Sequence, residues 1–138
     1  MADSRMSIEK RWKDRDFFEV HLRVRSDSCQ ACIDFYTTNE ELEKLRNGMQ
    51  DVANVKRQEF VWISGEDREQ VTHYLKLRLF MYDRRGIIGI EVVMDNKLES
   101  PFGMRAAFGL QAEIGQIDDF TQKLAYFIQE KVDVIEAL

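Results

Sequence analysis

Two cysteines, Cys29 and Cys32, form the sharpest chemical motif in the sequence, a C-x-x-C pair. In a redox-active site such a pair opens a helix, and the helix N-terminus lowers the thiol pKa. The residues around this pair instead alternate between apolar and polar, which predicts a strand, where positions i and i+3 point to opposite faces. The sequence has no second C-x-x-C pair to complete a zinc site. We therefore expect two unpaired thiols, with one of them a candidate for the core.

The two histidines, His21 and His73, stand outside any catalytic or metal-binding spacing such as H-E-x-x-H. The sequence also has no G-x-S-x-G nucleophile motif and no glycine-rich phosphate loop ending in G-K-[ST]. The acidic pairs Glu40/Glu41 and Asp118/Asp119 fall at expected helix starts, where the helix dipole favours negative charge. These observations predict a protein without enzymatic activity, cofactor or metal.

Six stretches have the patterning of strands, and most alternate apolar with polar residues in the period of two that marks a half-buried strand. They are residues 18–25, 29–35, 60–63, 75–79, 88–94 and 102–110. Residues 60–63 are apolar at every position, so we expect this strand to be covered on both faces. The loop at residues 83–86 predicts a tight hairpin in which Gly86 has a positive φ.

Two amphipathic helices complete the elements. The first follows Thr37 and Thr38, either of which can form a capping box with the glutamate three residues later. Its apolar face is Leu42, Leu45, Met49 and Val52. The last helix is expected to begin at Asp118 or Asp119. Its apolar face would be Phe120, Leu124, Phe127, Ile128, Val132 and Ile135.

The expected order is β-β-α-β-β-β-β-α, and the short links between strands favour antiparallel neighbours. This predicts an α+β fold, a largely antiparallel six-stranded sheet with both helices on one face. Residues 1–16 are mixed in charge and poorly periodic, so we expect a partly ordered N-terminal arm. Residues 17–138 would form a single domain, since the chain length is close to the usual domain size.

The polar face of the expected sheet is the candidate functional surface. If all strands share one core face, arginine, histidine, tyrosine and glutamate side chains project together from the other face. Arginine and tyrosine are enriched at interface anchors, so this face suits a protein partner. The plainer interpretation is an ordinary solvated sheet face. The candidate partner-binding residues are His21, Arg23, Tyr74, Arg78, Glu91 and Arg105.

The composition bounds the class of protein. The 138 residues include 20 Lys+Arg and 25 Asp+Glu, for a net charge of -5. The basic residues are interleaved with acidic ones rather than gathered in a field, which argues against nucleic-acid binding. There is no run of 18 apolar residues and no apolar signal-peptide core at the start, so neither a membrane span nor export is expected. These features favour a cytoplasmic protein.

The sequence resembles the WapI-like immunity proteins and allied small bacterial families of unknown function. The resemblance covers residues 17–136 and rests on D-F-Y-T-T leading into E-E-L-E-K-L, on R-G-I-I-G-I-E-V, and on D-F opening the last helix. It implies a non-enzymatic protein that neutralises a toxin domain by binding it. Residues 115–120 replace the polar lead-in to the last helix that is usual in the family, and the resemblance does not account for the loop at residues 96–101 or for the arm before Phe17.

Three functional hypotheses follow from the sequence. The first is a binding protein of the immunity type, with a toxin domain as partner. The second is a small-ligand-binding or sensing domain with a pocket between sheet and helices. The third is an enzyme of unknown type, which requires His21, Glu91 and Arg105 to converge. A homodimer through an open sheet edge is a further alternative, because an edge strand offers unpaired backbone groups.

Overall fold

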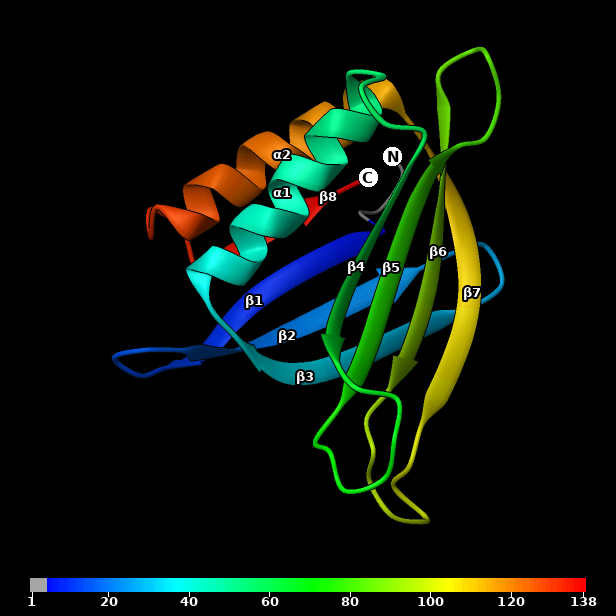
Figure 1. Cartoon of the computed structure of the whole chain (residues 1–138). Helices are drawn as coiled ribbons and strands as arrows, with labels where there is room; N and C mark the ends of the chain where they lie inside the picture. The colour runs from blue at the N-terminus through cyan, green and yellow to red at the C-terminus, as the bar shows by residue number, and fades with distance from the viewer. Residues whose placement is uncertain (1–4) are drawn as a thin grey trace.

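The computed structural model describes residues 5–138, which form eight strands and two helices (Figure 1). The elements in chain order are β1 (Met6–Lys13), β2 (Phe18–Arg25), β3 (Gln30–Thr37), α1 (Asn39–Ala53), β4 (Glu59–Gly65), β5 (Tyr74–Met81), β6 (Ile87–Asp95), β7 (Arg105–Glu113), α2 (Ile114–Ile128) and β8 (Val134–Ala137). The α+β class and the antiparallel pairing predicted from the sequence are confirmed.

The strands form two four-stranded sheets, so the prediction of one six-stranded sheet was wrong. The first sheet has the order β3-β2-β1-β8 and the second the order β4-β5-β6-β7. The chain leaves the first sheet after β3, passes through α1, and starts the second sheet with β4. The two sheets cross at a steep angle, and both helices cover the inner side of the corner between them (Figure 1).

Two strands lie where the sequence predicted other structure. β1 falls within residues 1–16, the expected arm, and Met6 and Ile8 are buried in the core. A β-bulge between Lys10 and Trp12 breaks the alternation, which explains why the period of two was not visible in this stretch. β8 falls within the expected last helix, and its Ile135 is buried from a strand.

The helix ends agree in part with the sequence. Thr38 is the N-cap of α1, and its side chain accepts a hydrogen bond from the backbone N–H of Glu41 at 3.2 Å. By contrast, α2 begins at Ile114, four residues before the expected Asp118. Glu113 and Gln116 form a capping box there, so a glutamate does the capping that Ser, Thr, Asp or Asn usually performs.

Strand β4 corrects the expectation that residues 60–63 are covered on both faces. Trp62 is buried at 5% exposure, whereas Val61 and Ile63 are 38% and 50% exposed. The reason is that only one face of the second sheet looks into the core: Val61 and Ile63 pair with Arg78 and Lys76 of β5, so all four side chains share the outer face. Gly86 has a φ of 89°, as predicted for the hairpin between β5 and β6.

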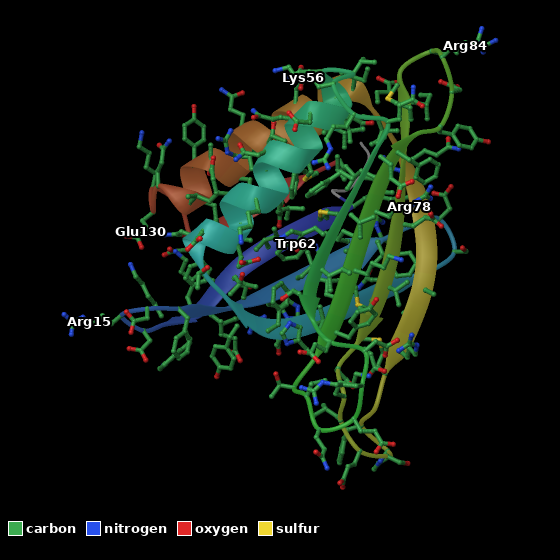
Figure 2. The ribbon with its side chains drawn as sticks, in the orientation of Figure 1. Arg15, Lys56, Trp62, Arg78, Arg84 and Glu130 are labelled. Carbon is green, nitrogen blue, oxygen red and sulfur yellow. The ribbon has the colours of Figure 1, made fainter. Side chains whose placement is uncertain are left out.

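One hydrophobic core joins the inner faces of both sheets to the apolar faces of α1 and α2. Trp62 lies in the space between the sheets and α1 (Figure 2), and its indole N–H donates to the carbonyl of Glu41 at 3.2 Å. The core contacts one face of each sheet. The other face of each sheet points outward, so the molecule has two separate outer sheet faces.

Candidate functional site

The outer face of the β3-β2-β1 part of the first sheet presents three rows of side chains. Strand register sets the rows, because residues directly opposite in antiparallel strands share a face. From the hairpin end inward, the rows are Trp12, Glu19 and Tyr36; then Glu9, His21 and Asp34; then Ser7, Arg23 and Cys32. Two of the predicted residues, His21 and Arg23, therefore lie on this face.

The bulge in β1 puts Trp12 on this surface. Lys10 pairs with Val20, but the next pair is Trp12 with Glu19, so Arg11 is the extra residue. Without it, Trp12 would have the same parity as the buried Met6 and Ile8 and would point inward. An inserted residue re-aims the side chains that follow it, and here it turns an indole toward solvent.

Trp12, Phe17 and Tyr36 form an aromatic cluster near the β1–β2 hairpin, whose tip carries Arg15 (Figure 2). The ring centroids lie 6.1 Å apart for Trp12–Phe17, 6.2 Å for Trp12–Tyr36 and 5.4 Å for Phe17–Tyr36. All three remain exposed, at 51%, 39% and 51% respectively. The contacts between the rings hold them in place while a large apolar area remains in water.

The middle row carries a hydrogen-bonded pair of side chains. The Nδ1 atom of His21 lies 2.5 Å from a carboxylate oxygen of Asp34. This contact fixes the ring on the sheet surface, next to the row that holds the aromatic cluster. Glu9 occupies the same row and forms an ion pair with Arg11 at 3.3 Å.

A surface groove of about 370 Å³ opens beside β3, between this face and loops of the second sheet. Its walls include His21, Asp34 and Tyr36 on one side and Thr72, His73 and Leu98 on the other. His73 is buried, stacks on Phe35 at a centroid distance of 5.2 Å, and is hydrogen bonded to the Ser64 hydroxyl at 2.8 Å. Burial lowers the pKa of His73 below its usual 6.5, so this wall of the groove is uncharged at neutral pH.

The other four predicted residues lie in the second sheet, so the six do not form one surface. Tyr74, Arg78, Glu91 and Arg105 belong to β5, β6 and β7. Their position follows from the division into two sheets, which alternation within single strands cannot reveal. Arg78 is hydrogen bonded to Glu91 and, at 3.1 Å, to Glu59, and its guanidinium lies 4.2 Å from the centre of the Phe80 ring.

Arg105 belongs to an ion network at the far end of the second sheet. It donates to both carboxylate oxygens of Asp67, at 2.9 and 3.1 Å, and to Asp95 at 3.2 Å. Hydrogen bonds from Arg105 and then Lys97 lower the pKa of Asp67 to about 2. The catalytic hypothesis required His21, Glu91 and Arg105 to converge, but His21 lies in the other sheet. Each of the three is hydrogen bonded to a partner outside the set: Asp34, Arg78 and Asp67 respectively.

The remaining chemical candidates are accounted for within residues 5–138. Cys29 and Cys32 are free thiols, as predicted; both are partly exposed, so neither is a core residue. No group of three His, Cys, Asp or Glu residues in this range is placed to hold a metal ion. The apolar space between the sheets and helices measures about 10 Å³, room for about one water molecule at most.

Sequence reasoning missed Trp12 and Phe17, because both fell in or beside the expected arm. The pattern of Trp12 and Phe17 flanking the turn-forming residues 14–16 is the signal that could have indicated a hairpin there.

Comparison with known proteins gives a plain result: no family model matches the chain, and no curated protein matches it. None of the helices described is long and apolar enough to cross a membrane.

Proposed function

We propose that this chain is a non-enzymatic, cytoplasmic binding protein that docks a protein partner on the outer face of β1, β2 and β3. The observation that carries the proposal is the exposed aromatic cluster of Trp12, Phe17 and Tyr36. The class of partner, a toxin domain, comes from the resemblance to immunity proteins and rests on that resemblance alone.

The aromatic cluster has the properties of an interface anchor. Trp and Tyr are the residues most enriched among interface hot spots, where truncation costs about 2 kcal/mol or more. A cluster that the sheet already holds rigid loses little side-chain entropy when a partner covers it. The three rings come from β1, the β1–β2 hairpin and β3, so together they form a continuous apolar patch.

The charges around the cluster indicate the chemistry of the partner. The same face carries Glu9, Glu19 and Asp34 together with Arg23, and Glu9 is paired with Arg11. A face of mixed charge contributes to specificity through complementary pairs with the partner. We therefore infer a partner with an apolar pocket or ledge to receive the rings and with charged groups around it that complement this mixed rim.

The groove beside β3 adds a place where a partner segment can insert. It shares His21, Asp34 and Tyr36 with the proposed docking face. The hypothesis of a sensing domain needs a pocket between sheet and helices, and the apolar space found there measures only about 10 Å³. This difference favours protein binding on the outer face over ligand binding within the core.

The test begins by recovering the partner from the native host by co-purification and mass spectrometry. Its affinity is then measured for the parent chain and for the Trp12→Ala and Tyr36→Ala variants. Tyr82→Ala is the matched control, because Tyr82 is 59% exposed but lies just after β5, in the hairpin loop of the second sheet. We expect each of the first two to weaken binding by about thirtyfold, the equivalent of about 2 kcal/mol.

Two further readouts sharpen the result. Binding should weaken as salt is raised, since the charged rim is exposed to solvent. Circular dichroism melts should show that the variants remain folded. The proposal fails if the partner binds Trp12→Ala and Tyr36→Ala as tightly as the parent, or if the chain turns over a defined substrate and no partner is recovered.

A further inference from the structure

We propose that two copies of this chain pair through the exposed edge of β7, which joins their second sheets into one continuous antiparallel sheet. The inferred two-fold axis passes beside Gly109. This surface lies on the opposite sheet from the aromatic cluster, so the inference is independent of the proposed function.

Hydrogen bonds at both ends of the β6–β7 ladder show which backbone groups of β7 face outward. The Asn96 N–H donates to the Met104 carbonyl at 3.1 Å, and the Ile114 N–H donates to the Gly86 carbonyl at 3.2 Å. In an antiparallel pair, residues that bond to the neighbouring strand alternate with residues that do not. Even-numbered residues of β7 therefore bond to β6, and Ala107, Gly109 and Gln111 direct their N–H and C=O groups outward.

Arg5 provides an independent check on this assignment. Its guanidinium donates to the carbonyl of Gln111 at 2.7 Å, so that carbonyl does point away from β6. On dimerisation this bond is exchanged for one from the second copy.

Apart from the Arg5 side chain on the Gln111 carbonyl, the central part of β7 has no proline, charge or bulge to prevent edge pairing. Native sheets protect their edges with proline, inward-pointing charges, bulges or short strands. β7 has nine residues, and the segment 106–112 contains neither a proline nor a charged residue. Its register with β6 runs without a break, and Ala107, Gly109 and Gln111 are exposed.

The sequence of β7 is complementary to itself when two copies run antiparallel about Gly109. Residues whose numbers sum to 218 then lie opposite each other, which places Arg105 across from Glu113 of the second copy at both ends. On the inner face, Phe108 lies opposite Leu110, and Ala106 opposite Ala112. A shift of two residues removes the Arg–Glu pairs, so charge and apolar contacts select the same register.

There is room beside this edge for an incoming strand. A groove of about 500 Å³ lies between the 109–113 part of β7 and residues 26–28 of the β2–β3 turn. The helices do not cover this edge, as Figure 1 shows for the yellow strand. A second β7 would occupy this groove while its outward backbone groups pair with those of the first.

The first experiment measures self-association of the full chain by analytical ultracentrifugation over a range of concentrations. Ala107→Pro removes an outward N–H without touching the bonds to β6, a position where an edge strand tolerates proline. We expect the dimer dissociation constant to rise by at least about tenfold. Ala107→Thr keeps the N–H and is the matched control, with a dissociation constant within about threefold of the parent.

The second experiment tests the register by disulfide cross-linking in a Cys29→Ser/Cys32→Ser background. Across the proposed axis, two Gly109→Cys residues would have Cα atoms about 5.5 Å apart, within the range of a disulfide. A Cβ at Gly109 lies 3.3 Å from the Ile90 carbonyl oxygen, a contact that a small shift relieves. Ala107→Cys is the control, because its two copies would be about 14 Å apart.

We expect Gly109→Cys to give a covalent dimer on a non-reducing gel, whereas Ala107→Cys by itself should not. A mixture of Ala107→Cys with Gln111→Cys should also give the covalent dimer. A chain that is monomeric at about 1 mM overturns the inference. So does a dimer that is unaffected by Ala107→Pro, or cross-linking of Ala107→Cys as efficient as that of Gly109→Cys. Circular dichroism of each variant separates loss of pairing from loss of fold.

Discussion

Alanine truncation along β4 distinguishes a strand covered on one face from a strand covered on both. Trp62 is buried, contacts the core and donates its indole N–H to the Glu41 carbonyl. Removing a buried aromatic side chain costs about 3–5 kcal/mol, so we expect Trp62→Ala to lose this much free energy of unfolding. Trp62→Phe keeps most of the apolar contact and loses the hydrogen bond, which is worth about 1 kcal/mol.

The neighbouring positions give the contrast. Ile63 is 50% exposed, so Ile63→Ala removes about half of the 1.5–3 kcal/mol that full burial of such a side chain provides, or about 1 kcal/mol. No enclosed cavity is left at an open surface, and no cavity cost is added. Val61→Ala should behave in the same way, since Val61 is 38% exposed. If β4 were covered on both faces, these two variants would instead cost 2 kcal/mol or more, roughly the cost of truncating a core residue.

The assay is urea unfolding monitored by far-ultraviolet circular dichroism. This signal reports backbone structure, so it can be compared between the parent and variants that lack the Trp62 indole. Stability differences are comparable only if the m-value is unchanged across the series. The assignment of faces in β4 is refuted if Ile63→Ala or Val61→Ala destabilises the protein as much as Trp62→Ala does.

Three further predictions concern the elements around the groove and α1. Gly65 has a φ of 80°, and a Cβ there would lie 2.1 Å from the His73 carbonyl oxygen; we expect Gly65→Ala to cost about 2 kcal/mol or more in urea unfolding, and a neutral result would contradict the turn geometry. The pKa of His73 is lowered by burial, so the unfolded chain binds a proton first as pH falls below 6.5. The free energy of unfolding should therefore decrease from pH 6.5 downward toward the folded-state pKa, and this decrease should shrink in His73→Gln; a raised His73 pKa in an NMR titration would refute it. Thr38→Ala removes the cap on the Glu41 N–H and should cost about 1 kcal/mol, whereas Thr38→Ser should stay close to the parent in thermal melts.

Much of the local structure was readable because it depends on neighbours in sequence. The alternation in residues 18–25 and the spacing of Leu42, Leu45 and Met49 reflect one buried face each, and both were found as expected. The cap at Thr38 and the positive φ of Gly86 are likewise local, since a hydroxyl three residues from an N–H or a missing Cβ decides them.

The errors share a physical cause, which is that partners distant in sequence decided the outcome. β8 is a strand because Met6 to Glu9 of β1 pair with Val134 to Ala137, a contact between the two ends of the chain. β1 was missed because its bulge breaks the period of two. Val61 and Ile63 were assigned to the core because a run of apolar residues does not show that only one face of its sheet is covered.

The sequence by itself determined the class of protein: a net-acidic α+β chain with antiparallel strands, capped amphipathic helices and free thiols. Those features follow from composition and from contacts within single elements. Only the tertiary structure decided that the strands divide into two sheets. That division separates His21 and Arg23 from Tyr74, Arg78, Glu91 and Arg105. Within the first sheet, the bulged pairing of β1 with β2 and the pairing of β2 with β3 bring Trp12, Phe17 and Tyr36 together. The physical reason is that alternation within a strand shows only which of its sides is buried. Which sheet the strand belongs to, and so which surface its exposed side chains share, depends on the strands that pair with it.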